Sequence, residues 1–273
     1  MLFTEFTQKM VEELNATGTG SFKSQDITRS SGETYCGIVC SGSGEGVSVS
    51  PVIHADALYK EYIDGASFES LLDKAKNISR QQPRGMNLAP TDITSWYKVK
   101  DFIYPRLVPD TGINRSATHV RRADLLVQFA VRVFVDSDGL GEALVRDELL
   151  DTWNVSLEEL EAVAFDNLAK DEFKIDTFMG QLNVLTNKYK VKGAVEMLNP
   201  VAMAEVIDKL GDVYILPSSV DEVILMPKDQ VDDVNFLKGM VQQVNDTAVE
   251  EKDLLSYNIY EYDKENETVV VVA

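Results

Sequence analysis

The chain has 273 residues, of which 44% are hydrophobic and 26% charged, so it is long enough and apolar enough to bury a sizeable core. Its 26 basic and 45 acidic residues give a formal net charge of −19, which repels nucleic acids and anionic membrane surfaces. The composition therefore argues against non-specific nucleic-acid binding. The start of the chain lacks the basic residues and unbroken apolar run of a secretory signal, and nowhere are there about 18 consecutive apolar residues. We expect a cytoplasmic protein without a membrane span.

The first portion of the chain, 1–85, has the pattern of a small α+β unit. Apolar residues at helical spacing predict an amphipathic helix at the start of the chain. We expect strands at 21–28, 33–40 and 47–53, followed by helices at 55–65 and 67–79. The two cysteines, Cys36 and Cys40, lie in one of these strands, roughly 13 Å apart at about 3.3 Å per residue. That separation suits neither a disulfide nor a shared zinc ion, so two buried thiols are predicted.

The segment 80–96 contains two prolines and little periodicity, which predicts a linker or long loop. Beyond it, 96–273 would form a larger α+β domain, either separate from the first unit or continuous with it. Helices and strands mix there without a regular strand–helix–strand rhythm, so we expect mainly antiparallel or mixed sheets flanked by helices.

The elements of this larger portion have recognisable signals. The alternating stretch 123–136 predicts a strand that pairs with another near 143–146 in a hairpin. Ser156 and Glu159 form a capping box, which predicts the start of a helix. Further helices are predicted at 97–103, 191–198, 201–210 (ended by Gly211) and 231–244, and further strands at 182–186, 213–216, 223–226, 257–263 and 268–273.

Two motifs suggest ligand loops, and both are better explained as turns. "SGSGEG" places Gly42, Gly44 and Gly46 before another predicted strand, whereas a phosphate-binding loop would lead into a helix. "DSDGLGEALVRD", Asp136–Asp147, partly matches a calcium loop, but Leu140 offers no side-chain oxygen and a preceding helix is missing. We predict hairpin turns at both places, and no metal site.

The two histidines, His54 and His119, are 65 positions apart. A catalytic or metal-binding histidine would have to lie near a nucleophile or a carboxylate, which the sequence does not establish for either. We favour a helix-entry position for His54 and a surface loop for His119.

Basic residues gather in two places in this acidic chain, and they are Lys98, Lys100, Arg106, Arg115, Arg121 and Arg122 in the first cluster and Lys188, Lys190 and Lys192 in the second. If the two clusters converged they would form an anion-binding patch. The favoured interpretation is that they pair with the protein's own carboxylates or form a solvated face. The acidic segments 156–168 and 246–267 are read as solvated surface or as a face for a basic partner.

Ser218 and Ser219 lie between two apolar runs in "YILPSSVDEVILMP". A nucleophile elbow would need glycines around the serine, and Leu216, Pro217 and Val220 stand there instead. The composition favours a turn between two strands that are buried on both faces.

Four stretches resemble a known family: "YPRLV" at 104–108, "DELLDTWNVSLEELEAVAFDNL" at 147–168, "VLTNKYKVKGA" at 184–194 and "YILPSSVDEVILMP" at 214–227. The sequence resembles an uncharacterised bacterial family, the domain of unknown function numbered 5688, which is common in anaerobic gut bacteria. The resemblance implies a bacterial, cytoplasmic protein and brings no activity with it. It makes the matching positions the first candidates for ligand binding, namely Arg106, Thr186, Asn187, Lys188, Ser218 and Ser219.

Because no nucleophile, metal cluster or cofactor fingerprint stands out, the leading hypothesis is a non-enzymatic module that binds a protein or a small ligand without a cofactor, in a regulatory or host-defence role. One alternative is an enzyme acting on an anionic small molecule, with Arg106 and Lys188 holding the anion and a serine, aspartate or histidine doing the chemistry. A second alternative is an acidic mimic that occupies the groove of a basic, nucleic-acid-binding protein. A pocket that unites a histidine, a carboxylate and a serine would favour the enzyme.

Overall fold

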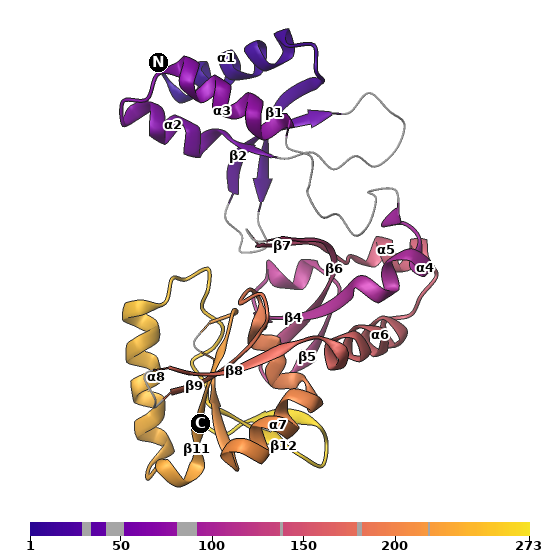
Figure 1. The fold of residues 1–273 in the computed structure, drawn as a ribbon, viewed down its shortest axis with the longest axis vertical. Coiled ribbons are helices and arrows are strands. Elements are labelled where there is room, and N and C mark those ends of the chain that lie inside the picture. Colours follow the sequence, from indigo (N-terminus) through magenta and orange to yellow (C-terminus); the bar gives the residue numbers. More distant parts are fainter. Residues whose placement is uncertain (29–33, 42–51, 81–91, 137–138, 179–181, 218) are drawn as a thin grey trace. The chain divides into compact units, whose positions relative to one another are not determined.

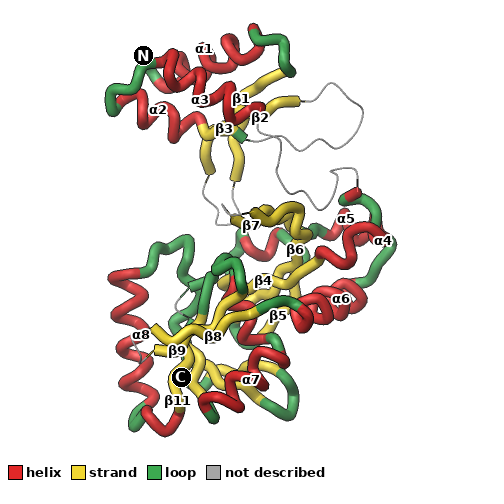
Figure 2. The backbone as a smooth tube through the Cα atoms, in the orientation of Figure 1, coloured by secondary structure: helices red, strands yellow, loops and turns green. Residues whose placement is uncertain are grey.

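The computed structural model describes residues 1–28, 34–41, 52–80, 92–136, 139–178, 182–217 and 219–273 (Figures 1 and 2). The chain forms two compact units, Met1–Asp92 and Ile93–Ala273. Their boundary falls within the proline-containing segment 80–96. Each unit combines helices with antiparallel sheets, so the protein has an α+β fold. Among the described residues, no helix has the length and apolar character needed to cross a membrane.

The unit Met1–Asp92 packs helices on a small antiparallel sheet (Figure 2). Its elements are α1 (Phe3–Ala16), β1 (Ser21–Thr28), β2 (Thr34–Ser41), β3 (Ile53–His54), α2 (Ala55–Ile63) and α3 (Phe68–Arg80). Phe6, Met10 and Leu14 recur every four residues on α1 and are almost completely buried in the core. The predicted strand 47–53 is described only at its end, as β3, and the motif "SGSGEG" lies outside the described residues from position 42 onward.

Both cysteines lie on β2, as predicted, and both are thiols that are half-buried against the core of this unit. Burial raises the pKa of the Cys36 thiol, and the nearby carboxylates of Asp56 and Asp26 raise it further. A thiol with a raised pKa carries little thiolate and is a poor nucleophile, so Cys36 is not a candidate catalytic group.

The unit Ile93–Ala273 begins with a sheet in the order β4-β6-β5, with β7 also paired to β6. Its elements are α4 (Trp96–Val99), η2 (Lys100–Phe102), β4 (Ile103–Pro109), η3 (Asn114–Ser116), β5 (His119–Arg122), β6 (Leu125–Asp136), β7 (Gly139–Leu144), α5 (Asp147–Trp153) and α6 (Leu157–Lys170). The hairpin expected from the alternating stretch is present as β6 and β7. Ser156 caps α6, because its Oγ accepts a hydrogen bond from the backbone N–H of Glu159 at 3.2 Å.

The rest of this unit is built on a longer antiparallel sheet in the order β13-β12-β10-β11-β9-β8. Its elements are β8 (Phe173–Phe178), β9 (Leu182–Asn187), η4 (Gly193–Leu198), α7 (Pro200–Leu210), β10 (Val213–Leu216), β11 (Val223–Pro227), η5 (Lys228–Gln230), α8 (Val234–Ala248), β12 (Tyr260–Asp263) and β13 (Thr268–Val271). Ile215 and Leu225 are completely buried, while Leu216 and Ile224 belong to a cluster with Leu237 of α8. The two central strands are therefore covered on both faces.

Candidate functional site

Thr186 and Asn187, two of the predicted ligand-binding residues, are buried at the end of β9 and stabilise the loop that follows. Thr186 Oγ1 donates a hydrogen bond to the carbonyl oxygen of Asp221 at 2.7 Å. Asn187 Oδ1 accepts from the backbone N–H of Tyr189 at 3.0 Å, and its Nδ2 donates to the carbonyl oxygen of Val191 at 2.8 Å. These side chains satisfy backbone groups of the fold.

The serine turn lies against the same loop. Gly193 N donates to the Asp221 carbonyl oxygen at 3.1 Å, and Lys192 N donates to Asp221 Oδ1 at 2.8 Å. Ser219 Oγ accepts from Asp221 N at 3.1 Å, a local bond typical of serine in turns. Ser218 lies outside the described residues. The geometry at Ser219 fits the predicted turn between β10 and β11.

The two basic clusters approach each other at Arg106 and Lys192, where carboxylates surround them. Arg106 is almost buried on β4, and its Nη1 lies 3.4 Å from Glu142 Oε2. Burial lowers the pKa of Lys192, the Arg106 charge lowers it further, and Asp221, Glu142 and Asp253 oppose the change. Three carboxylates beside two basic groups leave no net positive charge here for an anion.

Other basic residues also pair with carboxylates of the chain. Asp110 binds both Arg121 and Arg115, the latter at 2.6 Å, and the Arg115 hydrogen bond is the main cause that lowers the pKa of Asp110 to about 2. Lys188 Nζ lies 3.5 Å from Glu172 Oε1. This is the pairing favoured from the sequence.

The histidines belong to different compact units. His54 stacks on Tyr35 with ring centroids 4.3 Å apart. His119 was predicted to lie on a surface loop. It lies instead on β5, where its Nδ1 is 2.8 Å from the carbonyl oxygen of Ala117. The prediction was wrong because β5 has the sequence HVRR, in which Val120 is the single apolar residue, so no alternating pattern marks it as a strand.

The calcium-loop motif Asp136–Asp147 runs from the end of β6 through β7 to the start of α5. Residues 137 and 138 of this motif are not among the described residues. Leu140 pairs with Val135 in the ladder, so it serves the sheet. In the part of the chain that is described, no three His, Cys, Asp or Glu side chains are grouped so that they could hold a metal ion.

A buried charge cluster that the sequence analysis missed lies beside β4 and β6. Arg132 and Asp171 form an ion pair with both side chains about 95% buried, and the Arg132 guanidinium carbon lies 3.4 Å from the centroid of the Tyr104 ring. Glu196 is completely buried nearby, and this burial raises the pKa of its carboxyl to about 7. An arginine within a largely apolar strand was the signal that could have revealed the cluster.

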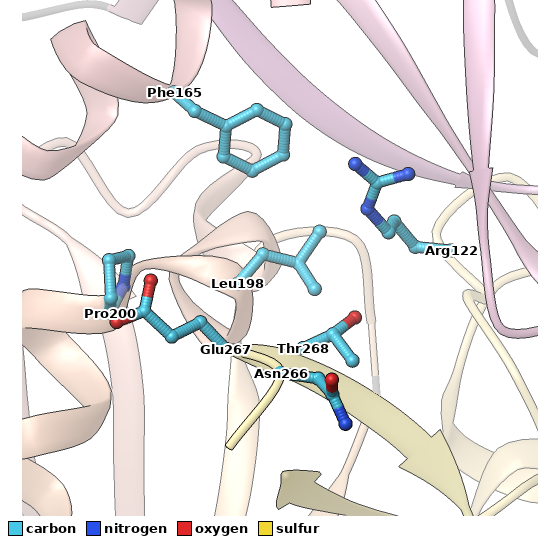
Figure 3. Close-up of a pocket in the computed structure, with 7 residues that line it drawn as sticks. All are labelled: Arg122, Phe165, Leu198, Pro200, Asn266, Glu267 and Thr268. Carbon is cyan, nitrogen blue, oxygen red and sulfur yellow. The ribbon is translucent and has the colours of Figure 1, made fainter. Parts of the chain in front are cut away.

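A pocket of about 270 Å³ opens elsewhere in the same unit (Figure 3). Four segments that are distant in the sequence meet there: the end of β5, the middle of α6, the junction of η4 and α7, and the turn between β12 and β13. The lining residues are Arg122, Phe165, Leu198, Pro200, Asn266, Glu267 and Thr268.

Two charged groups of opposite sign lie on different sides of this pocket. The guanidinium of Arg122 pairs with Glu161 of α6 and lies 5.9 Å from the centroid of the Phe165 ring. Figure 3 shows the Glu267 carboxylate near Pro200, with Leu198 lying between it and Arg122. A basic group, an acidic group and an apolar surface are thus presented together.

The β12–β13 turn holds Glu267 in an uncommon backbone conformation, with φ at 48°. Asp263 fixes this turn, since its Oδ1 accepts from the backbone N–H of Glu265 at 2.9 Å and its Oδ2 accepts from Asn266 Nδ2 at 2.7 Å. The turn's own hydrogen bonds therefore set the position of the Glu267 side chain at the pocket.

Comparison with protein-family models gives a match to a "Family of unknown function (DUF5688)" over residues 3–179 and 169–264. The chain belongs to this family. No curated protein and no solved structure matches this chain. The DUF5688 match includes Arg122, Phe165, Leu198 and Pro200, whereas the turn residues Asn266, Glu267 and Thr268 lie beyond it.

The sequence singled out only one pocket residue of this DUF5688 protein, Arg122, as a member of a basic cluster. Phe165 lies in a stretch quoted for the family resemblance, but nothing in the sequence connected it to Glu267, which is about a hundred positions away. The pocket is lined by α6 and by the β12–β13 turn, which only the tertiary fold brings to one place, and periodicity carries no information on such an arrangement.

Proposed function

We propose that this protein is a non-enzymatic binding module whose ligand is a small zwitterion, of the amino-acid type, held in the pocket at Arg122. The observation that carries the proposal is the presence of Arg122 and Glu267 on different sides of one pocket with an apolar surface between them. A carboxylate of the ligand would bind Arg122, and its ammonium group would bind Glu267. We further propose a bacterial, cytoplasmic setting, in which binding without turnover serves regulation.

The charge around the pocket favours a zwitterion over an anion. Arg122 already pairs with Glu161, and Glu267 adds a second carboxylate, so the site has no positive charge left over. The whole chain carries a formal charge of −19, which repels free anions. A neutral zwitterion avoids that repulsion and still offers each charged group a partner.

The size and the walls of the pocket support a small ligand with an apolar side chain. Its volume of about 270 Å³ is near the lower limit for small-molecule sites, which is roughly 300 Å³. Phe165, Leu198 and Pro200 supply apolar surface, and Asn266 and Thr268 supply polar atoms that can fix orientation.

The lining residues favour binding over catalysis. Thr268 provides the only hydroxyl among them, and none of the described lining residues is a histidine, lysine or cysteine that could act as its base. Arg106 and Lys188, the anion holders of the alternative enzyme, do not line this pocket.

Calorimetric titration with three compounds of one shape tests the proposal. We expect leucine to bind with a Kd of about 1 mM or tighter, and 4-methylpentanoate and 3-methylbutylamine, which each lack one charge, to bind at least about tenfold more weakly. Arg122→Gln and Glu267→Gln should each weaken leucine binding about tenfold or more, because each leaves one ligand charge without a partner.

Arg121→Gln is the matched control, since Arg121 is the neighbouring arginine, pairs with Asp110 and does not line the pocket. It should bind leucine as the parent protein does. Circular dichroism of each variant checks that the fold is intact. The proposal is wrong if neither leucine nor other zwitterions of this size bind. It is also wrong if 4-methylpentanoate, which lacks the ammonium group, binds as tightly as leucine.

A further inference from the structure

One flank of α8 carries a line of exposed apolar side chains. Leu237, Val241 and Asn245 are buried against the sheet, whereas Phe236, Met240 and Val244 are exposed by 70%, 49% and 49%. These three recur every four residues, so they lie on one side of the helix over about 12 Å at 1.5 Å per residue. We call Phe236, Met240 and Val244 the α8 stripe. α8 is labelled at the lower left of Figure 1.

Nothing in the packing of α8 on its own sheet requires the α8 stripe to be apolar. The cluster beneath the helix is complete with Leu237 and Val241, which pack with Leu216 and Ile259. Exposed apolar side chains that recur every four residues along one helix are typical of a surface that is buried when a partner binds.

Acidic residues surround both ends of the α8 stripe. The segment 228–252 has six carboxylates and three lysines, a formal charge of −3, and the carboxylates are Asp229, Asp232, Asp233, Asp246, Glu250 and Glu251. Lys252 Nζ lies 2.8 Å from Glu250 Oε2. All six are exposed. Lys238 is held by the side-chain oxygen of Asn258 at 3.2 Å. Tyr257, 38% exposed, donates a hydrogen bond to Asp246 at 2.9 Å and so adds an aromatic ring beside the helix.

We propose that the α8 stripe binds a basic amphipathic helix of another protein. The partner helix would place apolar residues at positions i, i+4 and i+8 on Phe236, Met240 and Val244, with lysine or arginine near each end. Apolar contact would provide affinity, and the carboxylates at the two ends of α8 would provide orientation and speed of association.

The charge of the surface selects this occupant over two others. A second copy of the chain would bring another segment of charge −3 against the first, and like charges facing each other across an interface are unfavourable. An anionic membrane would be repelled for the same reason. A basic helix is complementary both to the apolar line and to its acidic ends.

The test uses the full chain and a fluorescent 16-residue peptide with leucine at i, i+4 and i+8 and lysine at the other positions of both end turns. A scrambled peptide of the same composition is the control for unspecific charge attraction. We expect the amphipathic peptide to bind at least about tenfold more tightly than the scrambled one, and a rise in salt from 50 to 300 mM to weaken the binding.

Phe236→Ser combined with Met240→Ser should weaken peptide binding about tenfold or more and leave the fold intact, since both side chains are exposed. Val201→Ser on α7 is the control, because Val201 is also an exposed apolar residue on a helix, 50% accessible, and lies outside the α8 stripe. It should not change the affinity. Asp232→Asn with Glu250→Gln should weaken binding and reduce its salt dependence.

Three results would overturn the proposal. The first is equal affinity of the parent chain for the two peptides, and the second is unchanged affinity of the double serine variant. The third is a Phe236-dependent dimer in light scattering, or Phe236-dependent binding to vesicles that contain phosphatidylglycerol, in place of peptide binding. The inference does not depend on the pocket at Arg122, so leucine binding and peptide binding succeed or fail separately.

Discussion

At the scale of single residues, Glu196 has a carboxyl group whose pKa is raised by burial to about 7. It lies completely buried on η4, its Oε2 accepts a hydrogen bond from Asn199 Nδ2 at 2.8 Å, and its Oε1 has no hydrogen-bond partner within the described part of the chain. Burial is the main cause that raises its pKa to about 7, Asp171 adds to it, and Asn199 and Arg132 oppose it. A buried carboxyl of this kind takes up a proton when the protein folds near pH 6.

Glu196 should therefore make the folded state less stable as pH rises. Between an unfolded pKa near 4.5 and a folded pKa of about 7, the folded state holds one more proton than the unfolded state, so the free energy of unfolding decreases with rising pH. The total contribution of Glu196 over this window is roughly 3 kcal/mol. It is fully present below pH 4.5 and lost above pH 7.

Glu196→Gln removes this titration and keeps the shape of the side chain. We expect the variant to be more stable than the parent chain by up to about 3 kcal/mol at pH 8, and the difference to shrink towards pH 4.5, as measured by urea unfolding at several pH values. Glu205→Gln, at an exposed position on α7, is the control and should have little effect at either pH. A difference between Glu196→Gln and the parent that does not vary with pH would contradict the argument.

At the scale of elements, helices and strands were predicted correctly where the periodic pattern of apolar residues is long. The amphipathic helices α1, α6 and α8 and the hairpin of β6 and β7 all follow from periodicity or a cap. The helix predicted over 97–103 was only partly right, because Ile103 begins β4. Strand β4 contains Pro105 and Pro109, which it can accommodate because β4 ends the order β4-β6-β5 and proline is tolerated in strands at a sheet edge.

Elements fixed by distant contacts could not be predicted in this way. Strand β5 has Val120 as its single apolar residue, so no alternation marks it, and the helix predicted over 191–198 is the 3₁₀ helix η4, which begins at Gly193 against the Asp221 backbone. Thr186 and Asn187 were predicted to bind a ligand because they lie in a stretch that resembles the family. In the structure their side chains donate hydrogen bonds to backbone carbonyl groups and so stabilise a loop. A sequence motif does not distinguish a polar group that holds the backbone from one that holds a ligand.

The close contact at Gly193 gives a prediction at this scale. A Cβ there would lie 2.2 Å from Thr186 Oγ1, 2.6 Å from Asn187 N and 2.7 Å from the Asp221 carbonyl oxygen, and two of these atoms belong to backbone that cannot move freely. Gly193→Ala should therefore destabilise the fold by about 1 to 3 kcal/mol, measured by urea unfolding.

Gly239→Ala is the matched control on α8, because no atom lies within 4 Å of the added Cβ. Alanine is the better helix former, so this variant should be more stable than the parent chain by about 0.5 to 1 kcal/mol. Equal effects of the two substitutions would show that the loop adjusts without cost, and the argument for tight packing at Gly193 would fail.

At the scale of the whole molecule, each compact unit has a hydrophobic core of its own. Phe6, Met10 and Leu14 lie in the core of Met1–Asp92, and Leu185 and Ile215 lie in that of Ile93–Ala273. A unit with its own core can unfold as a separate cooperative step. The tryptophans allow the steps to be distinguished, because Trp96 and Trp153 both belong to the second unit, with ring centroids 5.5 Å apart.

Phe6→Ala in the full chain should lower the stability of the first unit by about 3 to 5 kcal/mol, because it removes a fully buried aromatic ring. We expect part of the far-UV circular dichroism transition in urea to move to lower concentration, while the midpoint seen by tryptophan fluorescence stays within about 0.2 M of the parent value. Leu185→Ala should do the reverse and shift the fluorescence midpoint. If Phe6→Ala moved both signals together, the two units would unfold as one, and the separate cores would not act as separate cooperative steps.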